Sequence, residues 1–351
     1  MGFSLSDLFA AIAVVVNGLP QGLLAMSFGF AALPTSLGFA IGALGALVFG
    51  SVAPISFQAE SIVLAGTMGR NRQERCTIVF ITGIVMSLVG AAGLLEPTIK
   101  FIGPAVENGM MAGVGVILAS VAVKMVKDYP LVGWASLLCA LATYAATGNL
   151  VNTIIISVFA GTLVPLVTGG RRAAQVTAEH IEQIKRVPLV INPAVIRGSL
   201  AMICMQIGGN IAYAGITGNI AKRVVNVDHV TLYSGIADAL SSFFGGGPVE
   251  AIISGTGAAP NPLSAAVIMM GLMTVILVSG LLPVIGKNVP SESIAGFLFV
   301  LGAIVAFPAN IKLAIDADPV VGGVATVVTA ATDPFTGLVA GVAVKFLLKR
   351  F

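Results

Sequence analysis

Two glutamates stand inside otherwise apolar stretches of the sequence. Glu250 lies in "GGGPVEAIISG", which starts at Gly245, and Glu60 lies in "GSVAPISFQAES", which starts at Gly50. An ionised carboxylate inside a membrane segment is costly, and it marks the path of an ion or a substrate by default. We therefore predict that both glutamates bind substrate. Glu60, Glu250 and Asp238, which precedes the second stretch, are the candidate ligands for a coupling ion, although Asp238 could instead orient the loop.

Each glutamate follows a proline and small residues that interrupt a helix. Non-helical backbone at membrane depth leaves N–H and C=O groups without partners unless protein, water or substrate covers them. Because proline suits the first turn of a helix, Pro54 and Pro248 are predicted to begin half-helices whose positive ends point at a pocket. The alternative is that Gly245 to Gly247 form a surface loop between spans.

Further polar residues recur at helical spacing in apolar surroundings. Gln206, Asn210, Tyr213 and Thr217 would form one stripe on a helix. Such a stripe either lines a pocket or holds helices together by hydrogen bonds. We predict that Gln206 and Asn210 contact the substrate.

A second polar pair lies in the first apolar run. Asn17 and Gln21 flank Pro20 with the spacing of neighbours on one helix face. We predict that both side chains line the pocket.

The composition defines the elements that must position these residues. Hydrophobic residues make up 57% of the 351 and charged residues only 9%, unlike a soluble domain. Apolar runs of spanning length recur without period-two alternation, which favours helices over a barrel. The sequence therefore predicts an all-α polytopic protein embedded in the lipid bilayer, in a bacterial-type inner membrane, with no sizeable soluble domain.

The chain divides into two similar halves. We predict seven spans in residues 1–168, a polar linker over 169–193 that contains a short surface helix, and seven more spans in 194–351. Pro54 and Pro248 lie 194 positions apart, and Pro104 and Pro290 lie 186 apart. An odd number of spans per half makes the second copy inverted, and Gly/Pro-interrupted segments at matching places indicate a transporter's substrate site.

Other function classes lack the residues they need. His180 and His229 show no spacing to a nucleophile or base, so we expect no enzyme. The three cysteines show neither metal-ligand nor disulfide spacing, so we expect no metal and no cofactor beyond a coupling ion. The basic residues are scattered and the net charge is only +3, which argues against nucleic acid as a partner.

The stretches "IAYAGITGNIAKRVVNVDH" and "GIADALSSFFGGGPVE" resemble the nucleobase-ascorbate transporters, the family of uracil, xanthine and purine permeases. The resemblance implies fourteen spans in two inverted sevens, broken third and tenth spans, and a core domain that moves against a gate domain. It also implies a homodimer that carries a purine or uracil together with H⁺ or Na⁺.

Transfer of the family's site to this sequence shows departures. The eighth-span carboxylate of the family falls at Gln206, and its tenth-span carboxylate falls at Ser254. Glu250 lies closer to the tenth-span proline, and the third span carries Glu60. The resemblance implies a nucleobase bound by side chains of these residues and by backbone N–H groups near Phe57, Gln58, Val249 and Glu250.

A second reading uses the same architecture. The stretch "LPQGLLAMSFGFAALPTSLGFAIGALGALVFGS" resembles the opening of sulfate-type anion transporters. Glutamates at the breaks disfavour an anion unless they are protonated. A channel is a weaker alternative, because the polar residues form isolated clusters instead of a continuous path.

Overall fold

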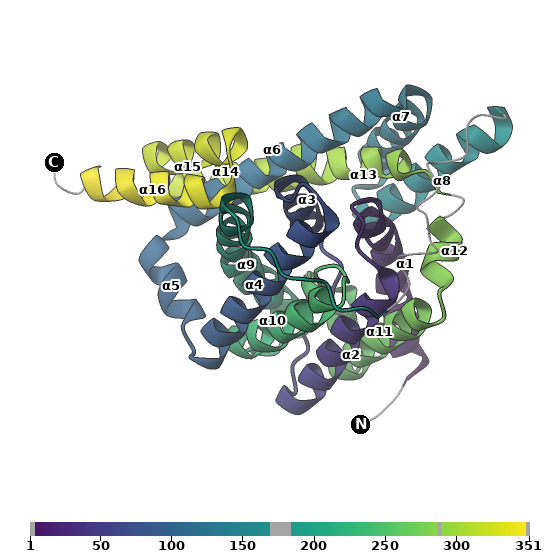
Figure 1. Ribbon diagram of the computed structural model, residues 1–351, viewed down its shortest axis with the longest axis horizontal. Helices are drawn as coiled ribbons and strands as arrows, with labels where there is room; N and C mark the ends of the chain where they lie inside the picture. The colour runs from purple at the N-terminus through teal and green to yellow at the C-terminus, as the bar shows by residue number, and fades with distance from the viewer. Residues whose placement is uncertain (1–3, 169–183, 287–288, 349–351) are drawn as a thin grey trace. The chain divides into compact units, whose positions relative to one another are not determined.

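The computed structural model describes residues 4–168, 184–286 and 289–348 (Figure 1). These residues are helical apart from loops and two short strands. The chain forms two compact units, which are described separately. Unit 1 comprises Met1–Thr98 and Thr177–Pro283, and unit 2 comprises Ile99–Val176 and Val284–Phe351.

Unit 1 contains both glutamate segments. Its elements are α1 (Leu5–Ser27), α2 (Ala32–Phe49), β1 (Ile55–Ser56), α3 (Ala59–Met68), α4 (Arg72–Ala91), α9 (Pro193–Ile220), α10 (Val227–Phe243), β2 (Glu250–Ala251), the 3₁₀ helix η2 (Gly255–Ala258) and α11 (Pro262–Val278). Helices α5 (Leu95–Ile102) and α12 (Leu281–Gly286) carry the chain from one unit into the other.

Unit 2 consists of helices only in its described part. They are α6 (Pro104–Asp128), α7 (Pro130–Thr147), α8 (Leu150–Thr168), the 3₁₀ helix η3 (Ser291–Ile294), α13 (Ala295–Phe299), the π-helical segment η4 (Val300–Ala306), α14 (Phe307–Ala317), α15 (Pro319–Ala331) and α16 (Pro334–Leu348).

Seven helical stretches in the described residues are long and apolar enough to cross a membrane. Five further apolar helices are 10 to 17 residues long. The chain is therefore an integral membrane protein, as the composition predicted. The surface helix expected in the middle of the linker, before Pro188, falls largely on residues 169–183, which lie outside the described residues. Residues 184–192 are described and are not helical.

The two prolines do not begin half-helices, so that prediction is wrong. Pro54 and Pro248 precede the strands β1 and β2, which pair antiparallel with Ser56 opposite Glu250. The helix α3 starts only at Ala59. Proline's fixed φ fits extended backbone as well as helix, and the strand pairing provides partners for backbone groups that would otherwise be unpaired.

The glycine-rich second break is buried. Gly245, Gly246 and Gly247 are all shielded from solvent, so they do not form the surface loop considered as an alternative. Gly245 has a φ of +92°, a left-handed conformation that glycine adopts readily. Its carbonyl accepts the backbone N–H of Ala31 at 2.8 Å, and Gly247 N–H donates to Thr35 Oγ1 at 2.9 Å. The break is thus tied to the start of α2.

Helix α10 lies in close backbone contact with α4. A Cβ added at Gly235 would lie 2.6 Å from the backbone nitrogen of Ser87, and one at Gly83 would lie 2.5 Å from that of Ala239. Small residues permit such close approach of helices in a membrane. This contact fixes the position of α10, which carries the side chains that hold both breaks.

Candidate functional site

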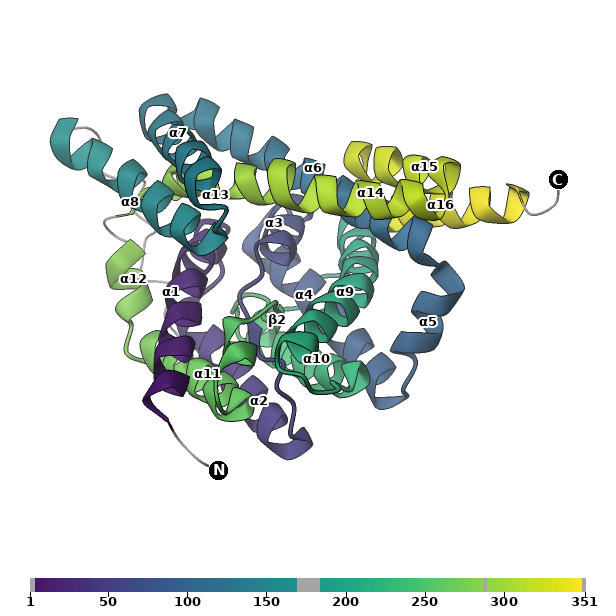
Figure 2. The ribbon, with the colours of Figure 1, turned by 180° about the vertical axis from the view of Figure 1, so that it is seen from behind.

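The two glutamate segments meet inside unit 1, where β1 pairs with β2. Strand β2 also packs against α9 and α10, and these three elements are labelled in Figure 2. Polar side chains predicted from distant parts of the sequence therefore come together within one unit.

A single amide links two carboxylates at this meeting point. Gln206 Nε2 on α9 donates to Asp238 Oδ2 at 2.8 Å and to Glu250 Oε1 at 2.5 Å. The other Asp238 oxygen accepts the backbone N–H of Val249 at 2.7 Å. All three polar side chains are buried. The N–H of Val249, which was expected to bind a substrate, thus donates its hydrogen bond to Asp238. This pairing is favourable because a buried carboxylate oxygen or N–H without a partner would be costly.

The carboxylate of Glu60 approaches from the first turn of α3. It is buried, and it lies close to the hydroxyl of Tyr213 on α9. Glu60 also interacts electrostatically with Glu250. Carboxylates from both breaks therefore face the same site, although they belong to different elements.

Several buried polar atoms at this site lack a hydrogen-bond partner within the described residues. They include Ser56 Oγ, Glu60 Oε2, Gln206 Oε1 and Asn210 Oδ1; Asn17 Oδ1 on α1 lacks a partner as well. Buried polar groups in folded proteins nearly always have partners. Most of these atoms are oxygen acceptors only, so the site favours a species that carries positive charge or donates hydrogen bonds.

The polar stripe on α9 serves partly to hold helices together. Asn210 Nδ2 donates to Thr231 Oγ1 at 3.3 Å and lies 3.5 Å from Ser234 Oγ, both on α10. The amide nitrogen of Asn210 thus joins α9 to α10 by hydrogen bonds, which is one of the two roles considered for the stripe. Its amide oxygen has no partner among the described residues.

Thr217, the last residue of the same stripe, supports the second break. Thr217 Oγ1 donates to the carbonyl of Ile252 at 2.9 Å and accepts the N–H of Ser254 at 3.0 Å. The Ser254 hydroxyl pairs with that of Thr256 at 2.7 Å. These contacts give Ser254 a structural role; its proposed contact with substrate stays a prediction.

The remaining predicted residues are Gln21 on α1 and the two residues that follow β1, Phe57 and Gln58. Gln21 is buried on α1, and a Cβ on the adjacent Gly22 would touch the Phe57 ring at 2.8 Å. Phe57 packs edge-on against Phe39, with ring centroids 5.2 Å apart. Gln58 Nε2 donates across to the carbonyl of Ala251 at 3.3 Å. The side chains of Phe57 and Gln58 thus make contacts within unit 1 next to the pair of β1 and β2. Their predicted backbone contacts with substrate stay untested.

Two hydroxyls at the site were not singled out from the sequence. Ser61 lies beside the Glu250 carboxylate, and Ser56 lies opposite Glu250 in the strand pair. Serines are common in membrane helices, so nothing in the local pattern distinguishes these two. Their significance depends on a pairing between distant segments.

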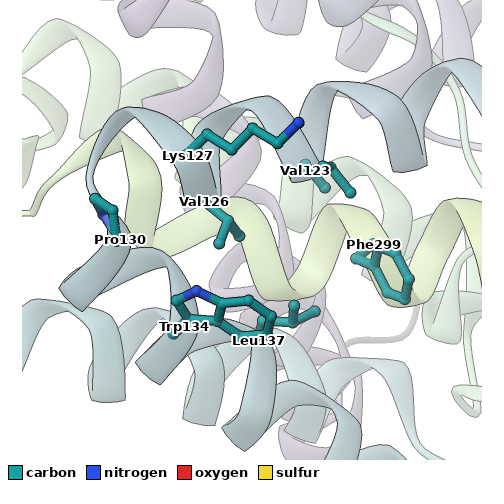
Figure 3. Close-up of a pocket in the computed structure, with 8 residues that line it drawn as sticks. Val123, Val126, Lys127, Pro130, Trp134, Leu137 and Phe299 are labelled. Atoms are coloured by element: carbon teal, nitrogen blue, oxygen red, sulfur yellow. The ribbon is translucent and has the colours of Figure 1, made fainter.

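Unit 2 has a separate cavity that contains none of the predicted residues. It is a groove of about 280 Å³ between α6, α7 and α13, where Trp134, Leu137, Val126 and Phe299 converge (Figure 3). Among the described residues that line it, Lys127 alone is charged. The groove lacks the convergent polar groups expected of a selective site, so we place the candidate site in unit 1.

Three solved structures of transporters have a similar fold. The transmembrane domain of a cyanobacterium bicarbonate transporter, BicA, matches with a TM-score of 0.70 at 15% identity, over 96% of this chain and 97% of that one. The murine Solute Carrier 26 family member A9 anion transporter in its inward-facing state matches with a TM-score of 0.68 at 15% identity, over 99% of this chain and 69% of that one. A further structure of SLC26A9 has a TM-score of 0.66 at 13% identity, over 98% and 65%.

No protein-family model and no curated protein matches the sequence. The assignment to the nucleobase-ascorbate family is wrong, because the similar structures are anion transporters. The motif that suggested it consists of small residues and a proline after a polar helix, and it does not identify a substrate. The structural neighbours are transporters, which is consistent with the expectation of a non-enzyme. At these identities the likeness establishes the fold.

Proposed function

We propose that the protein is a secondary transporter of a small inorganic anion, coupled to Na⁺ or H⁺ and working by alternating access. Bicarbonate and sulfate are the leading substrates. The fold likeness to anion transporters supports the anion, and the arrangement of acceptor oxygens around Gln206 supports the coupling ion.

The observation that carries the proposal is the Gln206 amide held between two buried carboxylates. Because Nε2 faces Asp238 and Glu250, the Gln206 Oε1 is turned away and unpaired. The Glu60 Oε2 and the Asn210 Oδ1 are unpaired as well. Carboxylate and amide oxygens are hard ligands that suit a small hard cation, and a carboxylate there could equally hold a proton.

A bound cation or proton resolves the conflict between an anionic substrate and acidic residues. Buried negative charge repels an anion unless it is compensated. The first N–H groups of α3 have no partner within that helix and carry its positive dipole end, so the anion would bind there. Since Glu60 lies in this first turn, the anion would enter only after Glu60 and Glu250 have been neutralised. Cation and anion would then move together.

The finer architecture belongs to the same proposal. We place fourteen spans in two inverted repeats, residues 1–168 and 194–351, joined by the linker 169–193. Unit 1 would serve as the core domain that carries the site, and unit 2 as the gate domain. A homodimer in a bacterial-type inner membrane completes the proposal.

Uptake by proteoliposomes tests the function. Purified protein is reconstituted, and entry of radiolabelled bicarbonate and of sulfate is followed with an inward Na⁺ gradient, an inward H⁺ gradient, or neither. We expect one anion to accumulate only with one of the gradients. Equal uptake with and without gradients would contradict coupling, and no uptake of either anion above empty liposomes would contradict the substrate class.

A further inference from the structure

The turn that follows α9 forms a basic cup outside the candidate site. A cavity of about 400 Å³ lies here, lined among others by Gly215, Asn219, Lys222 and Arg223. Both basic side chains are exposed, and the described residues that line the cavity include no carboxylate. The cup therefore concentrates positive charge around an open volume.

The backbone of this turn is unusual. Lys222 has a φ of +52° and is the one non-glycine residue with a left-handed backbone among the residues that the structure describes. The N–H of Arg223 donates to the carbonyl of Gly218 at 2.9 Å, the pattern of a helix end where glycine normally occupies the left-handed position. A side chain is disfavoured in this conformation. The lysine at this position points to a use for its charge.

Aliphatic side chains stand beside the basic ones. Ile216 and Ile220 on the last turns of α9 are 42% and 41% exposed, and Val224 is fully exposed. At the end of a membrane helix, exposed aliphatic residues contact acyl chains, while Lys and Arg extend toward the headgroups. The combination places the cup at the boundary between lipid tails and water.

We propose that this cup binds the headgroup of an anionic phospholipid. Lys222 and Arg223 pair with the phosphodiester, and the Asn219 amide donates a further hydrogen bond. Ile216 and Ile220 contact the first part of the acyl chain. Gly215 leaves room for the glycerol, because a Cβ there would meet no atom within 4 Å. Since Thr217 on the same turn holds the second break, the lipid anchors the end of α9 that supports the candidate site.

Native mass spectrometry of the full-length protein tests the proposal. The protein is purified in detergent with equal amounts of phosphatidylglycerol and phosphatidylcholine, and the lipids that stay bound are counted. We expect the wild type to retain one phosphatidylglycerol that the double variant Lys222→Gly, Arg223→Gln binds about thirtyfold more weakly, and Lys222→Gly alone about fivefold more weakly. Lys222→Gly suits the left-handed turn, so it removes the charge without loss of folding. Lys312→Gln, at an exposed lysine of α14, is the matched control and should retain the lipid.

A second variant separates the cavity from the charge. Gly215→Leu fills the open volume without altering any charge, and we expect it to lose the same lipid. Retention of phosphatidylglycerol by both the double variant and Gly215→Leu would overturn the proposal. Displacement of the lipid by millimolar inorganic phosphate would also overturn it, because the cup would then be a site for free anions.

Discussion

The two breaks in unit 1 are held by side chains of the same helix, α10, but through different groups. At the first break, the Tyr233 hydroxyl donates to the carbonyl of Ala53 at 2.5 Å and lies 3.2 Å from Ser51 Oγ. At the second break, Asp238 accepts the Val249 N–H at 2.7 Å. A neutral hydroxyl therefore supports the side of Glu60, whereas a carboxylate supports the side of Glu250.

The breaks also continue differently. The first leads into α3, a helix of 10 residues that carries Glu60 in its first turn. The second leads into β2 and a 3₁₀ helix of only 4 residues. Glu250 is bonded to Gln206, while Glu60 keeps one unpaired oxygen. Of the two carboxylates, Glu60 therefore has a buried oxygen without a partner among the described residues.

Displacement of α10 should disrupt both breaks at once. Gly235→Val places a side chain against the backbone of α4, where the nearest atoms cannot move aside. We expect the free energy of unfolding to fall by about 3 kcal/mol or more, at the upper end of overpacking effects. Equilibrium unfolding in detergent measures it. The control is Gly271→Val on α11, where a Cβ would meet no atom within 4 Å; equal losses for both variants would contradict the proposed role of the α10 contact.

Removal of the Asp238 carboxylate should affect mainly the second break. Asp238→Ala leaves the Val249 N–H and one Gln206 contact unpaired in a buried place, so we expect a loss of about 2 to 3 kcal/mol. The same unfolding experiment measures it, with the exposed Asp316→Ala as control. A loss no larger than that of the control would show that Asp238 does not support the break.

The two glutamates should differ in transport. We expect Glu60→Gln to reduce gradient-driven anion uptake at least tenfold, about 1.4 kcal/mol, because the amide removes the carboxylate oxygen left for the coupling ion. Glu250→Gln should also impair uptake, but it should lower the melting temperature as well, since Glu250 is already bonded to Gln206. The exposed Asp316→Asn should leave uptake unchanged. If the Glu60→Gln variant took up the anion at the wild-type rate, this result would contradict the role of Glu60 in coupling.

Removal of the neutral support should have the smallest effect. Tyr233→Phe deletes one buried hydroxyl and its bond to Ala53, for which we expect a loss of about 1 kcal/mol. The measurement is the midpoint of unfolding, compared with Asp238→Ala. A larger loss of stability for Tyr233→Phe than for Asp238→Ala would contradict the prediction that the carboxylate supports its break more strongly than the hydroxyl does.

The sequence predicted the long elements and the positions of the interruptions. Among the spans predicted in residues 194–351, two are the long helices α9 at Pro193–Ile220 and α10 at Val227–Phe243. Hydropathy and Gly/Pro placement are local properties, so they can be read along the chain without knowledge of its partners. The same locality explains the error about the family, because a proline and small residues that interrupt a helix say nothing about which groups face the substrate.

Only the tertiary structure decided how the interruptions are built and which groups face one another. That Ser56 lies opposite Glu250, that Gln206 joins Glu250 to Asp238, and that the Val249 N–H is already occupied all depend on contacts between segments far apart in sequence. A polar residue in an apolar run must find a partner or bind a ligand. The sequence by itself determined that such residues exist in this membrane protein, and the packing of α9, α10 and the two strands determined which of them are paired and which remain for a ligand.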